Sequence, residues 1–307
     1  MFRDFKNFQN KVLHLEITKK CPLSCSHCYN ESGFSMPHSV VNWRSIIQEA
    51  AQIGFRGVQF IGGEPFVYPQ LYNLVDYARS LSLEIEIYSN LAVPVRFDSL
   101  DKKVKLATSF YSCEASIHDA ITGGVGSWER TVAQIRKALE VGFALRVGMV
   151  KFPNDEKESD IISFLENLGV SRRNLKIDRI RQFGRGADNT QPTVNELCHH
   201  CGKTAAILFD GTITSCPMAR FISYGNVNDS SLVEAIFSEQ AVAIRKELAN
   251  RFKRYDASTW EILAGCNPDH CDPDLDDCDP DLNDCDPNHT CTPDFGCNPT
   301  LCSPDLN

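Results

Sequence analysis

The chain has 307 residues, of which 42% are hydrophobic, so it is not wholly disordered and fits one large domain with an appendage. No run of about 18 apolar residues occurs and no apolar segment follows the N-terminus, so the sequence predicts neither a transmembrane helix nor a secretory signal. The net charge of −9 argues against a nucleic-acid binder, and we expect neither a nucleic-acid nor a membrane partner.

The first part of the chain alternates between strand and helix patterns. Helical periodicity covers residues 40–51, 127–139 and 161–168, and Gly54, Gly142 and Gly169 end these segments. Ser127 is the expected N-cap of the second helix. Helix, glycine and strand recur in this order, which indicates parallel βα units. The predicted strands are residues 13–18, 57–61, 84–89, 104–109, 144–150 and 175–180.

Six such units predict an α/β fold, a partial (β/α)6 TIM-like barrel whose function lies on the loops after the strands. A doubly wound open sheet is the alternative that the pattern leaves open. A small Cys-rich C-terminal domain follows the barrel. The predicted domains are residues 1–183 (barrel), 184–263 (hairpin and helix) and 264–307 (tail).

The chain changes character after Gln182. Residues 184–188 contain two glycines and predict a turn or linker. An Asp-Gly turn between residues 205–209 and 212–216 predicts a β-hairpin. Ser230 or Ser231 is expected to start one helix that runs to Leu248. Its predicted buried stripe is Leu232, Val233, Ile236 and Phe237.

The tail is a low-complexity acidic repeat. Residues 264–307 hold eleven Asp and no Lys or Arg, which leaves 31 basic and 29 acidic residues in the rest of the chain. Seven of the 14 cysteines lie here, and each is followed by proline two positions later, so turns pinned at the sulfurs are expected. Three interpretations remain open: auxiliary-cluster ligands that wrap back on the body, a metal- or disulfide-stapled cap, and a flexible acidic tail.

A cysteine cluster follows the first predicted strand. Cys21, Cys25 and Cys28 form a C-x3-C-x2-C run, and three thiolates on one short loop can bind three irons of a cubic cluster. The fourth iron then keeps an open position for another ligand. A zinc site is the alternative, although this run holds only one of the two C-x2-C pairs that are usual in such sites.

This spacing resembles the radical S-adenosylmethionine (SAM) superfamily, and a second signature supports the resemblance. Gly62, Gly63, Glu64 and Pro65 follow the second predicted strand, where the family's GGEP-like segment binds the amino group of SAM. The glycines let the backbone approach a ligand, and Glu64 offers an acceptor to an ammonium. The resemblance implies that a [4Fe–4S] cluster on the three cysteines cleaves SAM to a 5′-deoxyadenosyl radical, which abstracts a substrate hydrogen.

Other cofactor contacts follow from the same resemblance. His27 and Tyr29 match the common HCY ending, with His27 near the adenine, and Ser89 and Asn90 stand where a ribose-contacting pair is usual. Ser109 and Arg130 are candidates for the SAM carboxylate. For these last two, a strand-end hydroxyl and a surface charge are the alternatives.

The hairpin region resembles the opening of a SPASM or twitch domain, which binds one or two auxiliary iron–sulfur clusters. The family's later C-x2-C-x5-C-x3-C pattern is replaced here by the C-x-P repeats. The number of auxiliary clusters is therefore left open, and the ligands are expected among a subset of the remaining clustered cysteines. These are Cys198, Cys201, Cys216, Cys266, Cys271, Cys278, Cys285, Cys291, Cys297 and Cys302.

Cys113 follows the fourth predicted strand and so lies near the functional face of a barrel. As in epimerising family members, its thiol is a candidate hydrogen-atom donor to a substrate radical. A small buried hydrophobe is the alternative.

The resemblance implies post-translational modification of a ribosomally made peptide by cross-linking, oxidation or epimerisation. Two alternatives remain: a radical dehydrogenase or epimerase of a sugar or aminocyclitol, and a non-enzymatic metal-binding protein. Only a dozen residues precede Leu13, so leader recognition is expected from a separate protein or the barrel rim. Oxygen-labile clusters imply a reducing cytoplasm and a flavodoxin- or ferredoxin-like electron donor.

Overall fold

The computed structural model describes residue 8 and residues 11–30, 41–152, 157–187, 191–198 and 201–256, the last range with side chains up to 252. The chain divides into two compact units, Met1–Lys246 and Glu247–Asn307. The seven tail cysteines lie outside the described residues, so every interpretation of the tail stays a prediction.

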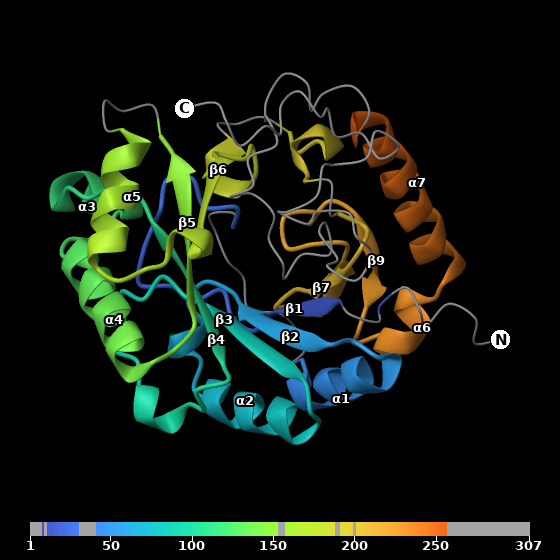
Figure 1. The fold of residues 1–307 in the computed structure, drawn as a ribbon. Helices are drawn as coiled ribbons and strands as arrows, with labels where there is room; N and C mark the ends of the chain where they lie inside the picture. The colour runs from blue at the N-terminus through green and yellow to red at the C-terminus, as the bar shows by residue number, and fades with distance from the viewer. Residues whose placement is uncertain are drawn as a thin grey trace, which may run out of the picture. The chain divides into compact units, whose positions relative to one another are not determined.

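Six parallel strands form the main part of the sheet, and they confirm the six predicted strands to within one or two residues. They stand side by side in chain order, without the reversal that a doubly wound sheet requires. This order is that of a partial barrel (Figure 1). The strands are β1 (Val12–Glu16), β2 (Gly57–Ile61), β3 (Glu84–Tyr88), β4 (Lys105–Phe110), β5 (Leu145–Lys151) and β6 (Leu175–Arg179).

Helices cover the outer face of this sheet, as Figure 1 shows for α1, α2 and α4. The predicted glycine stops at Gly54 and Gly142 are confirmed, because both residues cap their helices in the left-handed conformation. The periodicity did not reveal α2 and α3. The helices are α1 (Trp43–Ile53), α2 (Leu71–Ser80), α3 (Ala115–Thr122), α4 (Ser127–Val141) and α5 (Glu158–Asn167).

The prediction that Ser127 caps α4 was wrong. Gly126 is the N-cap and Ser127 is the first helical residue. The capping oxygens come from Asp119, which accepts hydrogen bonds from the backbone N–H of Gly126 at 2.5 Å and of Trp128 at 2.8 Å. Ser127 donates its hydroxyl to the same carboxylate. A residue of the preceding helix therefore does what the sequence assigned to a local serine.

The predicted hairpin is confirmed, and it extends the barrel sheet. β7 (Ala205–Ile207) pairs in parallel with β1 and antiparallel with β8 (Thr212–Thr214), which pairs with β9 (Ser223–Asn226). The sheet thus has nine strands within the described residues, in the order β6-β5-β4-β3-β2-β1-β7-β8-β9.

The single helix predicted after the hairpin was also wrong, because two helices occupy that stretch. α6 (Leu232–Ile236) begins with a capping box between Ser231 and Glu234. α7 (Glu239–Asp256) begins after Ser238, whose hydroxyl donates to the carbonyl of Ala235 and accepts from the N–H of Ala241. Ser238 satisfies backbone groups of both helix ends and so breaks the expected continuous helix.

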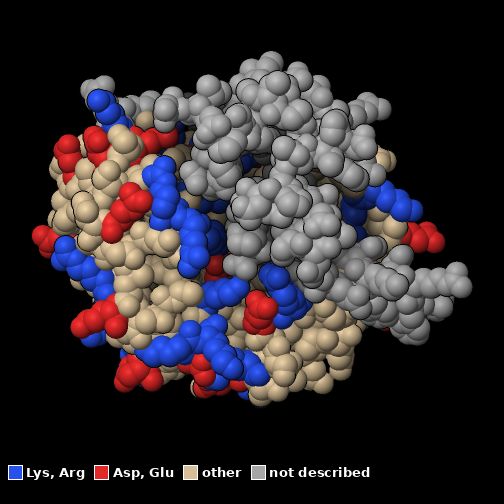
Figure 2. Space-filling view, in the orientation of Figure 1, with Lys and Arg blue, Asp and Glu red and all other residues tan. Residues whose placement is uncertain are grey.

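The core lies between the sheet and the outer helices. Phe110 of β4 stacks on Phe164 of α5 at 5.6 Å between ring centroids, and Trp128 of α4 packs on Phe164 at 5.7 Å. Basic and acidic side chains stand close together on much of the face in Figure 2 that the described residues form. No helix in the described ranges has both the length and the apolar character that crossing a membrane needs.

Candidate functional site

The loop after β1 carries the three cysteines of the predicted cluster motif. A turn brings the last two together, because the N–H of Cys28 donates to the carbonyl of Cys25 at 3.3 Å. Cys21 is exposed, while Cys25 and Cys28 are half-buried. Burial raises the pKa of Cys21, and burial together with the neighbouring thiols raises the pKa of Cys25 to about 12.

This donor set fits an iron–sulfur cluster. Burial disfavours the thiolate form of the cysteines, and coordination to iron is what stabilises a thiolate in such a place. Within the described ranges, no three Cys, His, Asp or Glu side chains are arranged to hold one metal ion.

The turn between α3 and α4 supports one side of the cysteine loop. The N–H groups of Ser24 and Ser26 donate to the carbonyls of Thr122 and Ile121, at 2.9 and 3.0 Å. These carbonyls end α3 and have no partner within their helix, so the loop satisfies them. Gly123 follows with a φ of +63°, and a Cβ there would lie 3.2 Å from the carbonyl oxygen of Ser24.

The glycines of the GGEP segment support the other side. The N–H groups of Gly63 and Glu64 donate to the carbonyls of Thr18 and Lys20, at 2.7 and 2.8 Å. A Cβ on Gly62 would stand 2.3 Å from the Thr18 carbonyl oxygen, and one on Gly63 would stand 2.3 Å from that of Lys20. The sequence predicts that the two glycines let the backbone approach a ligand. In the structure, their backbone approaches residues 18–20, which lead into Cys21.

Glu64 lies fully buried between the ends of β2 and β3. Its carboxylate accepts from the hydroxyl of Ser89 and the N–H of Asn90, each at 2.8 Å, and from the N–H of Phe66 at 2.9 Å. Burial raises the pKa of Glu64 to about 7, against the effect of these hydrogen bonds. The side chain of Asn90 in turn donates to the Sγ of Cys21 at 3.5 Å. Pro65 is buried at the start of the 3-10 helix η2 (Pro65–Val67).

His27 joins an aromatic cluster at the carboxyl ends of β4 and β5. Its ring packs edge-on against Tyr111 at 4.6 Å and against Phe152 at 5.0 Å. Burial, with a further contribution from Arg185, lowers the pKa of His27 to about 4, so the ring is neutral. Its buried Nδ1 has no hydrogen-bond partner among the described residues, which is what an atom awaiting a ligand would show.

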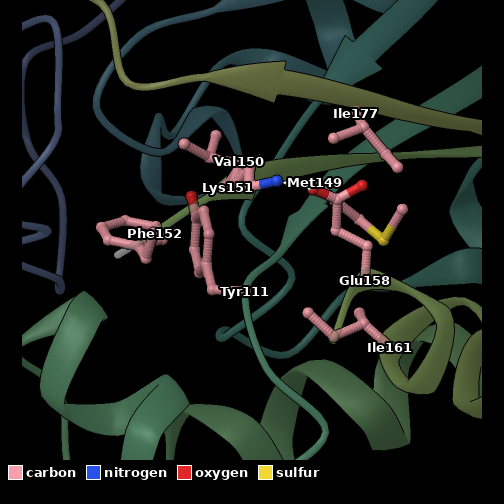
Figure 3. A pocket seen from close by; sticks show the side chains of 8 residues that line it. All are labelled: Tyr111, Met149, Val150, Lys151, Phe152, Glu158, Ile161 and Ile177. Atoms are coloured by element: carbon pink, nitrogen blue, oxygen red, sulfur yellow. Dashed lines mark ion pairs between the residues drawn. The ribbon is translucent and has the colours of Figure 1, made fainter. Parts of the chain in front are cut away.

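A small pocket lies beside this cluster. Figure 3 shows Tyr111 and Phe152 at one end and the ion pair of Lys151 with Glu158, at 2.7 Å, between Met149 and Ile177. The pocket therefore joins the two aromatic residues that contact His27 to a charged pair.

Of the other predicted cofactor contacts, Ser109 lies near the end of β4 and Arg130 lies in α4. The hydroxyl of Ser109 stands 3.1 Å from that of Tyr88. The Nε of Arg130 donates to the carbonyl of Ala92 at 3.0 Å, in the stretch after β3. Cys113 is half-buried three residues beyond the end of β4. The roles of Ser109, Arg130 and Cys113 stay predictions.

The three cysteines of the hairpin region come together. The Sγ atoms of Cys201 and Cys216 lie 2.8 Å apart, and the N–H of Cys201 donates to the carbonyl of Cys198. Hydrogen bonds with the Cys198 and Cys216 thiols, followed by burial, raise the pKa of Cys201. Thiols grouped around one buried cysteine fit a second cluster.

Comparison with known families decides what these loops belong to. The profile of the radical SAM superfamily matches residues 15–165, and that of the SPASM iron–sulfur cluster-binding domain matches residues 198–267. The chain carries a radical SAM domain and a SPASM domain. The iron–sulfur cluster and SAM expected from the sequence are the cofactors of these two domains.

The curated relatives of this radical SAM protein include enzymes named for peptides. The PqqA peptide cyclase of Rhodopseudomonas palustris is 30% identical over 60% of this chain and 51% of its own length. The mycofactocin maturase MftC of Mycobacterium tuberculosis is 30% identical over 59% and 48%. The subtilosin biosynthesis protein AlbA of Bacillus subtilis is 27% identical over 60% and 42%. The chain thus spans about half the length of these relatives.

Solved structures share the fold. SuiB of Streptococcus suis bound to its precursor peptide SuiA aligns over 78% of this chain and 67% of its own, with a TM-score of 0.62 and 16% identity. The anSMEcpe structure with bound AdoMet aligns over 81% and 86%, with a TM-score of 0.59 and 12% identity. Both confirm the predicted fold class.

Sequence reasoning missed a buried ion pair next to the cysteine loop. Arg220, in the loop after β8, donates to the carboxylate of Glu16 at the end of β1 and to the side chain of Asn30, each at 2.5 Å. Glu16 is fully buried, and burial raises its pKa to about 7 although Arg220 acts the other way. Arg220 therefore joins the SPASM region of this protein to the barrel at two points: Glu16 at the end of β1, and Asn30 two residues beyond Cys28.

Sequence reasoning also missed Arg185. This residue belongs to the segment predicted as a turn or linker, and its side chain contacts the cysteine loop. The only signal available was a pair of glycines that flank one arginine in residues 184–186, a pattern that predicts a turn as readily as a close contact.

Proposed function

We propose that this chain is a radical SAM enzyme that modifies a ribosomally made peptide. The observation that carries the proposal is the junction of the two predicted motifs, because the GGEP backbone is hydrogen-bonded to the residues that lead into Cys21. Curated relatives named as a peptide cyclase and a maturase support a peptide as the substrate.

In this proposal Cys21, Cys25 and Cys28 hold the SAM-binding cluster, and Cys198, Cys201 and Cys216 are ligands of an auxiliary cluster. When bound, the first cluster supplies the electron that cleaves SAM into methionine and a 5′-deoxyadenosyl radical. The proposal assigns the buried carboxylate of Glu64 to the amino group of SAM, and it assigns the Nδ1 of His27, which has no partner among the described residues, to the adenine. The aromatic rings of Tyr111 and Phe152 exclude water beside it.

The test is anaerobic reconstitution of the full chain with iron and sulfide, followed by incubation with SAM and a low-potential reductant. We expect 5′-deoxyadenosine from the wild type and none from the variant Cys25→Ala. Wild-type protein that binds iron but forms no 5′-deoxyadenosine would contradict radical SAM chemistry. Iron that remains after Cys21, Cys25 and Cys28 are all changed to Ala measures the auxiliary cluster.

The substrate class needs its own readout. A short peptide encoded beside the gene is the probe, and its mass after reaction identifies the modification. Loss of two hydrogens indicates cross-linking or oxidation, while an unchanged mass that gains one deuterium in heavy water indicates epimerisation. An unmodified peptide together with turnover of a sugar or aminocyclitol would replace the peptide with the small-molecule alternative. A flavodoxin- or ferredoxin-like protein is the proposed electron donor, and the reducing cytoplasm is the proposed location.

A further inference from the structure

The 3-10 helix η5 (Gly184–Ala187) packs against the loop that carries the three cysteines. The N–H of Arg185 donates to the carbonyl of Cys28 at 2.8 Å, and its side-chain Nε donates to the carbonyl of Cys25 at 2.8 Å. One residue, 157 positions beyond Cys28 in the chain, therefore fixes the backbone of two of the three cysteines. The two hydrogen bonds come from different atoms of Arg185, so together they fix both the distance and the orientation of the Cys25–Cys28 turn relative to this residue.

The glycines on either side of Arg185 bring it to this place. Gly184 has a φ of +52°, and a Cβ there would lie 2.3 Å from the carbonyl oxygen of Tyr29. A Cβ on Gly186 would lie 3.0 Å from the carbonyl oxygen of His27. Both neighbours are backbone atoms of the cysteine loop, which cannot move aside without moving the cysteines. The contact is thus a close fit of backbone on backbone, with the arginine at its centre.

The charge of Arg185 lies at the loop itself. The Nε of its guanidinium group stands 2.8 Å from the carbonyl oxygen of Cys25. A guanidinium keeps its positive charge at any physiological pH, so it acts on whatever the thiols of this loop bind.

We propose that Arg185 is a positioning residue that holds the Cys25–Cys28 turn and, through its positive charge, makes the cluster bound there easier to reduce. This rests on the proposed function, since it concerns the cluster that the three cysteines would hold. Reduction adds one negative charge to the cluster, and a nearby guanidinium stabilises the reduced form more than the oxidised form. Charge and hydrogen bonding around the sulfur ligands set the potentials of such clusters.

The experiment compares the reconstituted full-length wild type with Arg185→Gln and Arg185→Lys. Arg172→Gln is the matched control, because Arg172 is an exposed arginine of η4 (Arg172–Asn174). Each protein is titrated with reductant and followed by electron paramagnetic resonance. The signal that changes when SAM is added identifies the SAM-binding cluster, which separates it from an auxiliary cluster.

At the potential where the wild-type cluster is half reduced, we expect Arg185→Gln to have an at least tenfold lower ratio of reduced to oxidised cluster. For a one-electron couple, a tenfold change corresponds to about 59 mV. We expect Arg185→Lys to stay within about threefold of the wild type because it keeps the charge, and Arg172→Gln to be unchanged. Loss of the SAM-responsive signal in Arg185→Gln, with auxiliary iron kept and the signal restored in Arg185→Lys, would equally support the proposal.

Three results would overturn it. The first is an Arg185→Gln protein with the wild-type ratio. The second is an Arg185→Lys protein that behaves like Arg185→Gln, which would show that the charge is not what matters. The third is loss of all iron together with the circular dichroism of the fold, which would make Arg185 a general structural residue. Failure of the wild type to cleave SAM would instead count against the proposed function, whatever the Arg185 variants do.

Discussion

The carboxylate of Glu64 accepts a hydrogen bond from the backbone N–H of Asn90 at 2.8 Å, and the side chain of Asn90 donates to the sulfur of Cys21. This relay connects the loops after β1, β2 and β3. A glutamate expected to meet only a cofactor therefore also assembles the site that would receive it.

Glu64 should make the stability of the iron-free chain depend on pH. Its pKa is raised from 4.5 to about 7, so between these values the folded chain keeps a proton that the unfolded chain has lost. The free energy of unfolding should therefore fall as the pH rises from about 4.5 to 7, by about 3 kcal/mol from this group. Urea unfolding of Glu64→Gln across this range should lack that part of the slope. Equal slopes in both proteins would contradict the prediction.

Arg220 should be far more important for stability than a surface arginine. Arg220→Met leaves Glu16 buried without its cation, and we expect a loss of about 3–5 kcal/mol in the free energy of unfolding. The control Arg179→Met removes an exposed pair with Glu196 and should cost less than about 1 kcal/mol. Adding Glu16→Gln to Arg220→Met should recover part of the loss. Equal losses in the free energy of unfolding for the two single variants would show that the buried pair stabilises the fold no more than the exposed pair does.

Gly63 should tolerate no side chain. In Gly63→Ala the new Cβ would meet the backbone oxygens of Lys20 and Lys19 at 2.3 and 2.5 Å, so the start of the cysteine loop must shift. We expect a cost of about 1–3 kcal/mol and less iron per chain after reconstitution. Gly142→Ala is the control, because a Cβ at Gly142 would have no neighbour within 4 Å and only its φ of +89° is strained. Full iron loading in Gly63→Ala would count against this role.

Asp119 should support the cysteine loop through the α3–α4 turn. Against a raising effect of burial, hydrogen bonds from Trp128, Gly126 and Ser127 lower its pKa, so the carboxylate caps α4 in its charged form. Asp119→Ala should cost about 1–2 kcal/mol of unfolding free energy, as loss of a helix cap does. Thermal unfolding measures this cost. Asp119→Asn, which keeps one acceptor oxygen, should lose less, and equal losses would point to the charge instead.

Cys113 tests the type of reaction. If its thiol donates a hydrogen atom to a substrate radical, Cys113→Ala should still form 5′-deoxyadenosine but should not yield an epimerised peptide. The measurement is deuterium incorporation into the peptide in heavy water, with Cys113→Ser as a second variant. Wild-type incorporation in both variants would leave Cys113 as a packing residue.

The sequence by itself determined the domain types and the order of the six parallel strands. The C-x3-C-x2-C spacing, the GGEP segment and the strand periodicities act within a few residues, so local geometry specifies them. The cysteine loop and the GGEP segment could be expected to meet, because the loops after adjacent parallel strands share one edge of a barrel.

Only the tertiary structure decided what surrounds the cysteine loop. Arg185, Arg220 and Asp119 gain their roles from contacts with distant or neighbouring elements, and no periodicity records such pairings. The hairpin at β7 became part of the barrel sheet because β1 leaves an edge whose backbone groups need partners. Where the chain returns in space determines which carbonyl each donor meets, and that depends on the packing of the whole sheet.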